Sequence, residues 1–548
     1  MIEALLLSTV LNVDLQGRFF GTLPEGGDVV LRFEQVQGHT AAWLTSLQHA
    51  RFQMPVPQIE DTDHGARLVV LFPDGEVAME VQQGAAGLEL QLSETGATTV
   101  LERVSPLGPH TTWGGDLPMA SGDVEPIVVH VTSDNGPARL DLPTRSVWQY
   151  PIQVDTQADG TLAWTIPGDC HQIMVKPVGD TAPGMAVQGD ALVPLTMHRN
   201  PLEVVERPQE PSGDVPWTSS EVTLTLRIET TVSGTLVMPA GDDVDTLVVL
   251  VPGRTESRNG LNNAHSPLLV LADTLARAGV ASLRIDAPGQ GGSASWPTDQ
   301  GPLSWSKWSL QLSGIIEQLR EQGNWKELIV AGLDDGAMSA LLTAARLGGD
   351  IDGVILLSPP ALPRSIIESE QLRALLRSRG VSADNAAAVV QARLEFIRLG
   401  LERVNDGAMR QAARAWLSTM AQRAGGLEAS DELVNVVIER LRAPGRLKDL
   451  AEEPRRYLPR ITAPMLAIWG EQDRLLDAAQ HERITVEAVE RLGGTIESHV
   501  LERGSHWLRP VPQPGRGVTT VRRTFLPEAL TIIENWIKPV RAIQPRLP

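Results

Sequence analysis

Five short runs made mainly of apolar residues follow one another through the second part of the chain, and they constrain its fold more than any other feature. Stretches with the periodicity of amphipathic helices separate them. Strands that are apolar on both sides are typical of a parallel sheet, because helices cover both of its faces. The runs therefore predict an α/β domain. They are Thr246–Val251, Ala281–Ile285, Leu328–Ala331, Val354–Leu357 and Met465–Ile468.

The first two hundred residues have a different texture. Short stretches in which apolar and polar residues alternate, such as Asp28–Phe33 and Gly87–Leu92, are broken by Gly, Pro, Asp and Asn. A period of two residues with closely spaced turn residues is typical of antiparallel β-structure. We therefore predict that this region is all-β.

This β region also repeats itself. Phe20–Pro24 resembles Gly114–Pro118, and Leu101–Arg103 resembles Met197–Arg199, at spacings of 94 and 96 residues. Pro55 and Pro151, each preceding a β-branched residue, are also 96 residues apart. The spacings predict two copies of one β-module, at 1–105 and 106–200. Chance similarity between two Gly- and Pro-rich β segments is the alternative.

Residues 201–219 contain four prolines and no periodicity, so they are predicted to be a linker. The α/β domain is placed at 220–548. It begins with alternating apolar residues from Val222 to Ile228 and a hairpin partner at Gly234–Pro239. A long stretch rich in Ala, Leu, Arg and Glu, at about 359–463, is predicted to be a helical cap inserted over the strand ends.

One apolar strand runs directly into Gly332-Leu333-Asp334-Asp335-Gly336 and then into an Ala- and Leu-rich helix. This strand–turn–helix context is that of a nucleophile elbow, whose glycines allow a tight turn that exposes the central side chain. The central residue is usually Ser, but here it is Asp334.

Two further residues complete a catalytic order. Asp473 follows the strand Met465–Ile468, and His506 lies in a loop after a later strand. Nucleophile, acid and His in this order, each at a strand end, predict the α/β-hydrolase fold. His506 is the predicted base, and Asp473 is the acid that orients it.

The chain resembles bacterial α/β-hydrolase esterases grouped with the serine-aminopeptidase-like hydrolases, over nearly all of its length. Val251–Gly260 resembles their oxyanion loop, Leu283–Ser293 their Gly-rich strand end, and Gly504-Ser505-His506 their His loop. An amino-terminal β-domain is also typical of them, although a second copy is unusual. The resemblance implies a small-molecule substrate, an ester or a related compound. An oxyanion hole would take one backbone N–H from Asp335 and the other from Gly253 or Arg254.

Asp334 departs from this family, which has Ser there. Carboxylate nucleophiles occur on this fold in proteins similar to epoxide hydrolases and haloalkane dehalogenases, where Asp attacks a saturated carbon and His activates water. Attack on an ester carbonyl would instead give an anhydride. Three interpretations stay open. Asp334 is the working nucleophile or base of a hydrolase, or the site has lost catalysis and binds a ligand or partner, or Asp334 is structural and another residue attacks. Ser339, in the following helix, is interpreted as a packing residue.

Charge gives two further expectations. If Asp334 and Asp335 face one cleft, repulsion and desolvation should raise the pKa of one of them. A carboxylate at Asp334 should stabilise the protonated imidazole and raise the pKa of His506.

Composition excludes several functions. A net charge of −20 argues against nucleic acid and anionic membranes as partners. No apolar run reaches the length of about 18 residues that a membrane span needs. No Cys/His cluster has metal-ligand spacing and no Walker-type loop is present, so neither metal nor cofactor is predicted.

Two sequence features bear on the cellular compartment of the protein. Cys170 is the only cysteine, so no internal disulfide can form. The amino terminus carries the acidic Glu3 and no cleavage site, which favours a cytoplasmic protein unless a native signal peptide was removed. The oligomeric state is not indicated.

Overall fold

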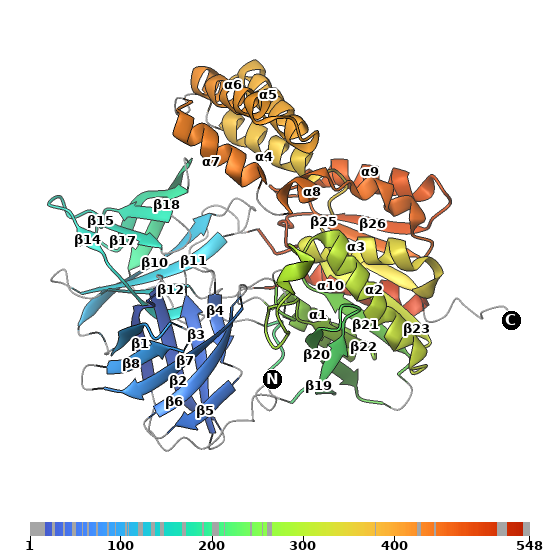
Figure 1. Ribbon diagram of the computed structural model, residues 1–548, viewed down its shortest axis with the longest axis horizontal. Helices are drawn as coiled ribbons and strands as arrows, with labels where there is room; N and C mark the ends of the chain where they lie inside the picture. The colour runs from blue at the N-terminus through green and yellow to red at the C-terminus, as the bar shows by residue number, and fades with distance from the viewer. Residues whose placement is uncertain are drawn as a thin grey trace.

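The structure, a computed structural model, describes residues 17–24, 28–36, 39–46, 51–56, 58–62, 65–72, 75–84, 87–93, 95–104, 107, 109–118, 124–132, 138–142, 147–166, 171–188, 191–199, 208–212, 214–241, 244–254, 256–259, 266–378, 380–424, 429–442, 445–511 and 523–540. Two antiparallel β-sheets lie beside an α/β domain, and a group of helices rises above that domain (Figure 1).

The amino-terminal region is all-β, as predicted. Its first sheet, of nine described strands, has the order β4-β3-β2-β1-β9-β8-β7-β6-β5. These strands are β1 (Gly17–Thr22), β2 (Asp28–Val36), β3 (His39–Ser46), β4 (Arg51–Pro55), β5 (Gln58–Thr62), β6 (Gly65–Phe72), β7 (Gly75–Gln83), β8 (Gly87–Leu92) and β9 (Thr98–Arg103).

The second sheet, also of nine described strands, has the order β13-β12-β11-β10-β18-β17-β16-β15-β14. Its strands are β10 (His110–Pro118), β11 (Val124–Thr132), β12 (Ala138–Leu142), β13 (Val147–Ile152), β14 (Asp155–Thr156), β15 (Leu162–Ile166), β16 (His171–Val175), β17 (Thr181–Gln188) and β18 (Ala191–Arg199).

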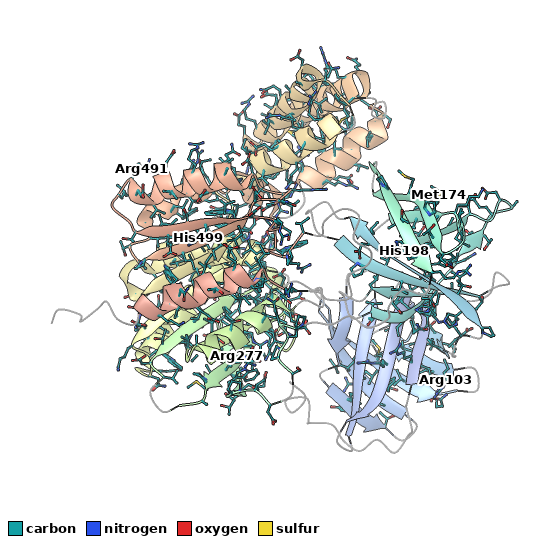
Figure 2. All side chains as sticks on the ribbon, turned by 180° about the vertical axis from the view of Figure 1, so that it is seen from behind. Arg103, Met174, His198, Arg277, Arg491 and His499 are labelled. Atoms are coloured by element: carbon teal, nitrogen blue, oxygen red, sulfur yellow. The ribbon has the colours of Figure 1, made fainter. Side chains whose placement is uncertain are left out.

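The two sheets have the same strand order, and matching residues make the same contact where first and last strands meet. Arg103 lies 5.1 Å from the ring centroid of Phe19 in the first sheet, and Arg199 lies 5.3 Å from that of Trp113 in the second. Figure 2 shows Arg103 on one sheet and His198, the neighbour of Arg199, on the other. These likenesses support the duplication, which stays a prediction.

The sheets also pack on each other. Val30 of the first sheet belongs to the apolar core of the second. The ring of Phe20 meets that of Tyr150 edge-on, with centroids 5.8 Å apart, and the Tyr150 hydroxyl donates to the carbonyl of Asp28 at 3.3 Å. The two modules are therefore joined by both apolar and polar contacts.

The α/β domain contains a sheet of eight described strands in the order β19-β20-β22-β21-β23-β24-β25-β26. Strands β19 and β20 form the antiparallel hairpin, β20 pairs antiparallel with β22, and the strands from β22 onward pair in parallel, as predicted. They are β19 (Trp217–Thr225), β20 (Thr231–Pro239), β21 (Thr246–Val251), β22 (Ala281–Ile285), β23 (Glu327–Leu333), β24 (Gly353–Leu357), β25 (Met465–Gly470) and β26 (Ile496–Leu501).

Helices cover both faces of this sheet, which is why its central strands are apolar throughout. In β21, Leu247 and Val249 pack in the core beneath α2, α3 and α9, and Val248 and Leu250 pack beneath α1 and α10. These helices are α1 (Pro267–Arg277), α2 (Trp305–Glu321), α3 (Asp335–Leu347), α9 (Ala478–Glu490) and α10 (Pro527–Val540).

The stretch after β24 is helical, as expected, and its role as a cap stays a prediction. Helices α4 to α7 stand above the sheet in Figure 1, and α8 lies where this group meets the rest of the domain. They are α4 (Arg364–Ser378), α5 (Ala383–Leu401), α6 (Asp406–Ala424), α7 (Asp431–Arg442) and α8 (Arg446–Ala451).

One boundary is corrected. Strand β19 begins at Trp217, three residues inside the predicted linker, because its pairing with β20 extends to Trp217 opposite Pro239. Residues 201–207 of the linker lie outside the described residues, as does Cys170.

Candidate active site

Asp334 occupies the turn between β23 and α3, at the carboxyl end of the central strand. Its backbone has φ 53° and ψ −116°, a conformation that costs free energy for any residue with a Cβ. The flanking glycines make this turn feasible. A Cβ on Gly332 would lie 2.2 Å from the carbonyl oxygen of Gly336, and a Cβ on Gly336 would lie 2.4 Å from that of Val251. The predicted elbow geometry is therefore present around Asp334.

The three predicted catalytic side chains lie together at the strand ends. Nδ1 of His506 is 2.7 Å from Oδ2 of Asp473, which is fully buried. Nε2 of His506 is 3.1 Å from Oδ1 of Asp334, in an ion pair rather than an aligned hydrogen bond. The Asp334 side chain is 40% exposed whereas that of His506 is 2% exposed, so of the pair only Asp334 is open to solvent.

The surrounding loops hold His506 and Asp473 in place. The other oxygen of Asp473 accepts hydrogen bonds from the backbone N–H groups of Leu475 and Leu476, at 2.7 and 2.9 Å. The hydroxyl of Ser358, at the end of β24, donates to the backbone carbonyl of His506. Ser358 has φ 51°, so a second strained residue supports the site.

The charges of the site favour an ion pair. Burial by itself lowers the pKa of His506, but the carboxylates of Asp334 and Asp473 outweigh it and raise that pKa to about 10. Burial raises the pKa of Asp334, but His506 and Arg364 outweigh it and the pKa is lowered. The rise in pKa expected from repulsion between the adjacent acids is therefore wrong for Asp334. The two neighbouring acids therefore favour the protonated form of His506.

The residues predicted for the oxyanion hole have other partners. The N–H of Gly253 donates to Oε2 of Glu256, and the N–H of Arg254 donates to Oδ2 of Asp335, both at 2.8 Å. The N–H of Asp335 interacts with the carboxylate of Asp334. The three residues do lie around the elbow, but the Gly253 and Arg254 donors face carboxylates of the protein itself. Thr255 and Gly260 of the same loop lie outside the described residues.

Arg254 connects the elbow to the helical segment. Its guanidinium contacts Oδ1 of Asp335 at 3.3 Å and Oδ2 of Asp449, on α8, at 2.9 Å. It also stacks on Trp305, with 4.3 Å to the ring centroid, and the Trp305 indole N–H donates to Asp335 at 2.7 Å. Asp335 thus faces Arg254 and Trp305. The sequence carried no signal for Trp305 or Asp449, because they come from distant segments.

Ser339 packs as predicted, and two further histidines lie on α9 and β26. Ser339 is fully buried, and its hydroxyl donates to the backbone carbonyl of Asp335, so it packs within α3. His481 is buried on α9 and accepts a hydrogen bond from the N–H of Ala361 at 2.8 Å. His499 lies on β26, where Figure 2 shows it away from the β-modules.

Among the described residues, no group of three or more His, Cys, Asp or Glu side chains is arranged to hold a metal ion. None of the described helices has both the length and the apolar character needed to cross a membrane.

Residues 242–508 match the family of S33 serine aminopeptidases, Hydrolase_4. The matched segment begins just before β21 and ends just after His506, so it contains the elbow after β23, the acid after β25 and the histidine after β26. The α/β domain has the α/β-hydrolase fold. No curated protein matches the chain.

Solved structures with similar folds include hydrolases from three organisms. An esterase of Pyrococcus furiosus is 12% identical, over 63% of this chain and 98% of its own, with a TM-score of 0.35. Proline iminopeptidase of Mycobacterium smegmatis is 15% identical, over 59% and 99%, with a TM-score of 0.36. A thermostable carboxyl esterase of Bacillus coagulans is 14% identical, over 59% and 99%, also with a TM-score of 0.36.

Proposed function

We propose that this protein is a hydrolase in which Asp334 attacks a saturated carbon of a small organic substrate. One observation carries the proposal: a solvent-accessible carboxylate at a strained elbow touches a buried histidine whose other nitrogen is held by Asp473. An ionised carboxylate is ready to attack, and the lowered pKa of Asp334 keeps it ionised.

The protonation of His506 fits a reaction in which an ester first forms at Asp334 and is then hydrolysed. In the first, an oxygen of Asp334 bonds to the substrate carbon, and the leaving group departs with its electron pair. The resulting ester is neutral, so the main cause of the raised pKa of His506 disappears. His506 then loses its proton, to the oxygen of an opened epoxide or to solvent, and can take a proton from water as that water attacks Cγ of Asp334. The bond between Cγ and the ester oxygen, which came from Asp334, then breaks, and this oxygen takes the proton from His506 and leaves as part of the alcohol. The acid left at Asp334 gives its proton to His506, which restores the carboxylate and the imidazolium.

Attack on an ester carbonyl is less well supported, because a carboxylate that attacks there gives an anhydride and not an ester that water then hydrolyses. Epoxides, haloalkanes and esters cleaved at the alkyl carbon are therefore the preferred substrate classes.

A single turnover in H₂¹⁸O tests the proposal. With enzyme in excess over short acyl esters, epoxides and haloalkanes, the peptide that contains Asp334 should gain one ¹⁸O, because water attacks its carboxyl carbon. Asp334→Asn should lose both label and turnover, and Asp350→Asn, an exposed acid after α3, should keep both. Turnover without label in the Asp334 peptide would refute the covalent route.

A ligand-binding protein without catalysis is the second candidate. The carboxylates that accept the Gly253 and Arg254 N–H groups favour it, since they remove the donors that acyl transfer uses. Absence of turnover across the whole panel, together with saturable binding of the same compounds, would support this candidate over the hydrolase.

A further inference from the structure

Three arginines meet at one glutamate beside the elbow. Oε1 of Glu368 accepts from Nε of Arg364 at 3.0 Å, and Oε2 accepts from Nη2 of Arg393 at 2.7 Å and from Nη2 of Arg446 at 2.6 Å. The arginines come from α4, α5 and α8. Three positive charges thus face a single negative charge, in a chain whose net charge is −20. Such a local excess attracts anions.

Arg364 is the member of this cluster that reaches the elbow. Its guanidinium lies 5.8 Å from the ring centroid of Trp305, and the Trp305 indole N–H donates to Asp335, the neighbour of Asp334. The charge of Arg364 also acts on Asp334, whose pKa it helps to lower after the larger effect of His506. Arg364 is therefore the member of the cluster that contacts Trp305 and whose charge acts on Asp334.

The guanidinium of Arg364 has donors to spare. Its side chain is 42% exposed, and within the described part of the chain its only hydrogen bond is the one from Nε to Glu368. Both terminal NH₂ groups therefore remain available. Arg254 differs, because it is only 14% exposed and its donors contact Asp335, Asp449 and the carbonyl of Leu303.

We propose that Arg364 binds an anionic group of the substrate, so that the enzyme acts on small organic acids whose reacting carbon faces Asp334. A guanidinium fork matches a carboxylate in geometry and charge. Its positive charge also offsets the repulsion that the anion would otherwise meet from Asp334. That the reacting carbon faces Asp334 rests on the proposed function, whereas the binding of the anion by Arg364 does not.

Matched substrate pairs test the charge preference. Bromobutanoate is compared with bromobutane, and glycidate with propylene oxide, at fixed ionic strength. We expect kcat/KM to be about tenfold or more higher for the acid of each pair, as loss of a charge-assisted hydrogen bond suggests. Equal values, or a preference for the neutral member, would overturn the proposal.

Two substitutions on α4 separate recognition from folding. Arg364→Gln should lower kcat/KM for the acids about tenfold or more beyond any loss for the neutral compounds. Arg373→Gln, an exposed arginine on the same helix, should change neither class. An equal loss for both classes in Arg364→Gln, at unchanged melting temperature, would show that Arg364 does not recognise the anion.

Binding without turnover distinguishes this inference from the proposed function. Calorimetry with hydroxybutanoate on Asp334→Asn should give binding that weakens in the double variant with Arg364→Gln and weakens with added salt. If no substrate is turned over but this binding is found, the hydrolase fails and the anion site holds. If neutral and acidic substrates are turned over equally, with label at Asp334, the anion site fails and the hydrolase holds.

Discussion

The carboxylate of Asp335 accepts the backbone N–H of Arg254 at 2.8 Å, so one of the predicted oxyanion donors has a partner within the protein. In an acyl-transfer enzyme such a donor is free, because removal of one donor costs about a hundredfold or more in kcat. The contact therefore places a negative charge beside an N–H group that acyl transfer would need.

This contact predicts that serine alone will not produce an esterase. Asp334→Ser should hydrolyse p-nitrophenyl acetate barely above background, because the Arg254 N–H remains bound to Asp335. Asp334→Ser combined with Asp335→Ala frees that donor and should raise kcat by about tenfold or more over the single variant. Equal rates in the two variants, both with native circular dichroism, would mean that Asp335 does not block the hole.

The ion pair between His506 and Asp334 predicts an unusual titration. The imidazole of His506 should lose its proton near pH 10 in the resting protein, and at lower pH in Asp334→Asn, because one of its two carboxylates is removed. NMR of the protein with ¹⁵N-labelled histidine measures both values. An unchanged titration of His506 in Asp334→Asn would contradict the assignment.

The same raised pKa predicts how stability depends on pH. A group whose pKa is higher in the folded state stabilises the fold fully below its unfolded value, about 6.5 for histidine. This stabilisation is lost progressively as the pH rises from there to about 10. Urea unfolding at a series of pH values should therefore show a falling free energy of unfolding over this interval, with a shallower fall in Asp334→Asn.

Asp473 is predicted to matter for catalysis more than for folding. Asp473→Asn should lower kcat by about a hundredfold or more, because an amide does not stabilise the imidazolium of His506 or hold its tautomer. Asp477→Asn is the matched control, since Asp477 caps α9 through the N–H of Gln480 and Asn caps equally well. A similar loss of activity in both variants would indicate that the loop, rather than the Asp473 carboxylate, is responsible.

The elbow predicts a sharp difference between two glycines near α3. Gly336→Ala should destabilise the protein by about 1–3 kcal/mol or more, because the new Cβ would lie 2.4 Å from the carbonyl of Val251. Gly349→Ala adds a Cβ that meets nothing within 4 Å and should leave the melting temperature nearly unchanged. Thermal unfolding of both variants measures this contrast, and equal melting temperatures would contradict the elbow packing.

Much of the fold could be predicted from local patterns. Runs made mainly of apolar residues indicated the parallel strands, and β21 and β22 have the predicted bounds, because a strand buried on both faces carries its signature in consecutive residues. Gly332 and Gly336 around Asp334 indicated the elbow in the same way, since a tight turn depends on residues adjacent in sequence.

The partners of the predicted oxyanion donors could not be predicted. Arg254 and Asp335 are 81 residues apart, and which acceptor an N–H meets depends on how the side chain of Asp335 turns once β21 and β23 are paired. The sequence showed three residues able to form an oxyanion hole. Only the folded arrangement gave the Gly253 and Arg254 N–H groups carboxylate partners.

The amino-acid sequence by itself thus determined the order of strands and helices, the elbow at Asp334, and the pairing of His506 with Asp473, because each depends on short patterns at strand ends. The tertiary structure decided which charged side chains lie close to these site residues. Arg364 approaches the elbow across Trp305, and Asp449 meets Arg254 across 195 residues of chain. Long-range electrostatics depends on distance in space, which no local pattern encodes.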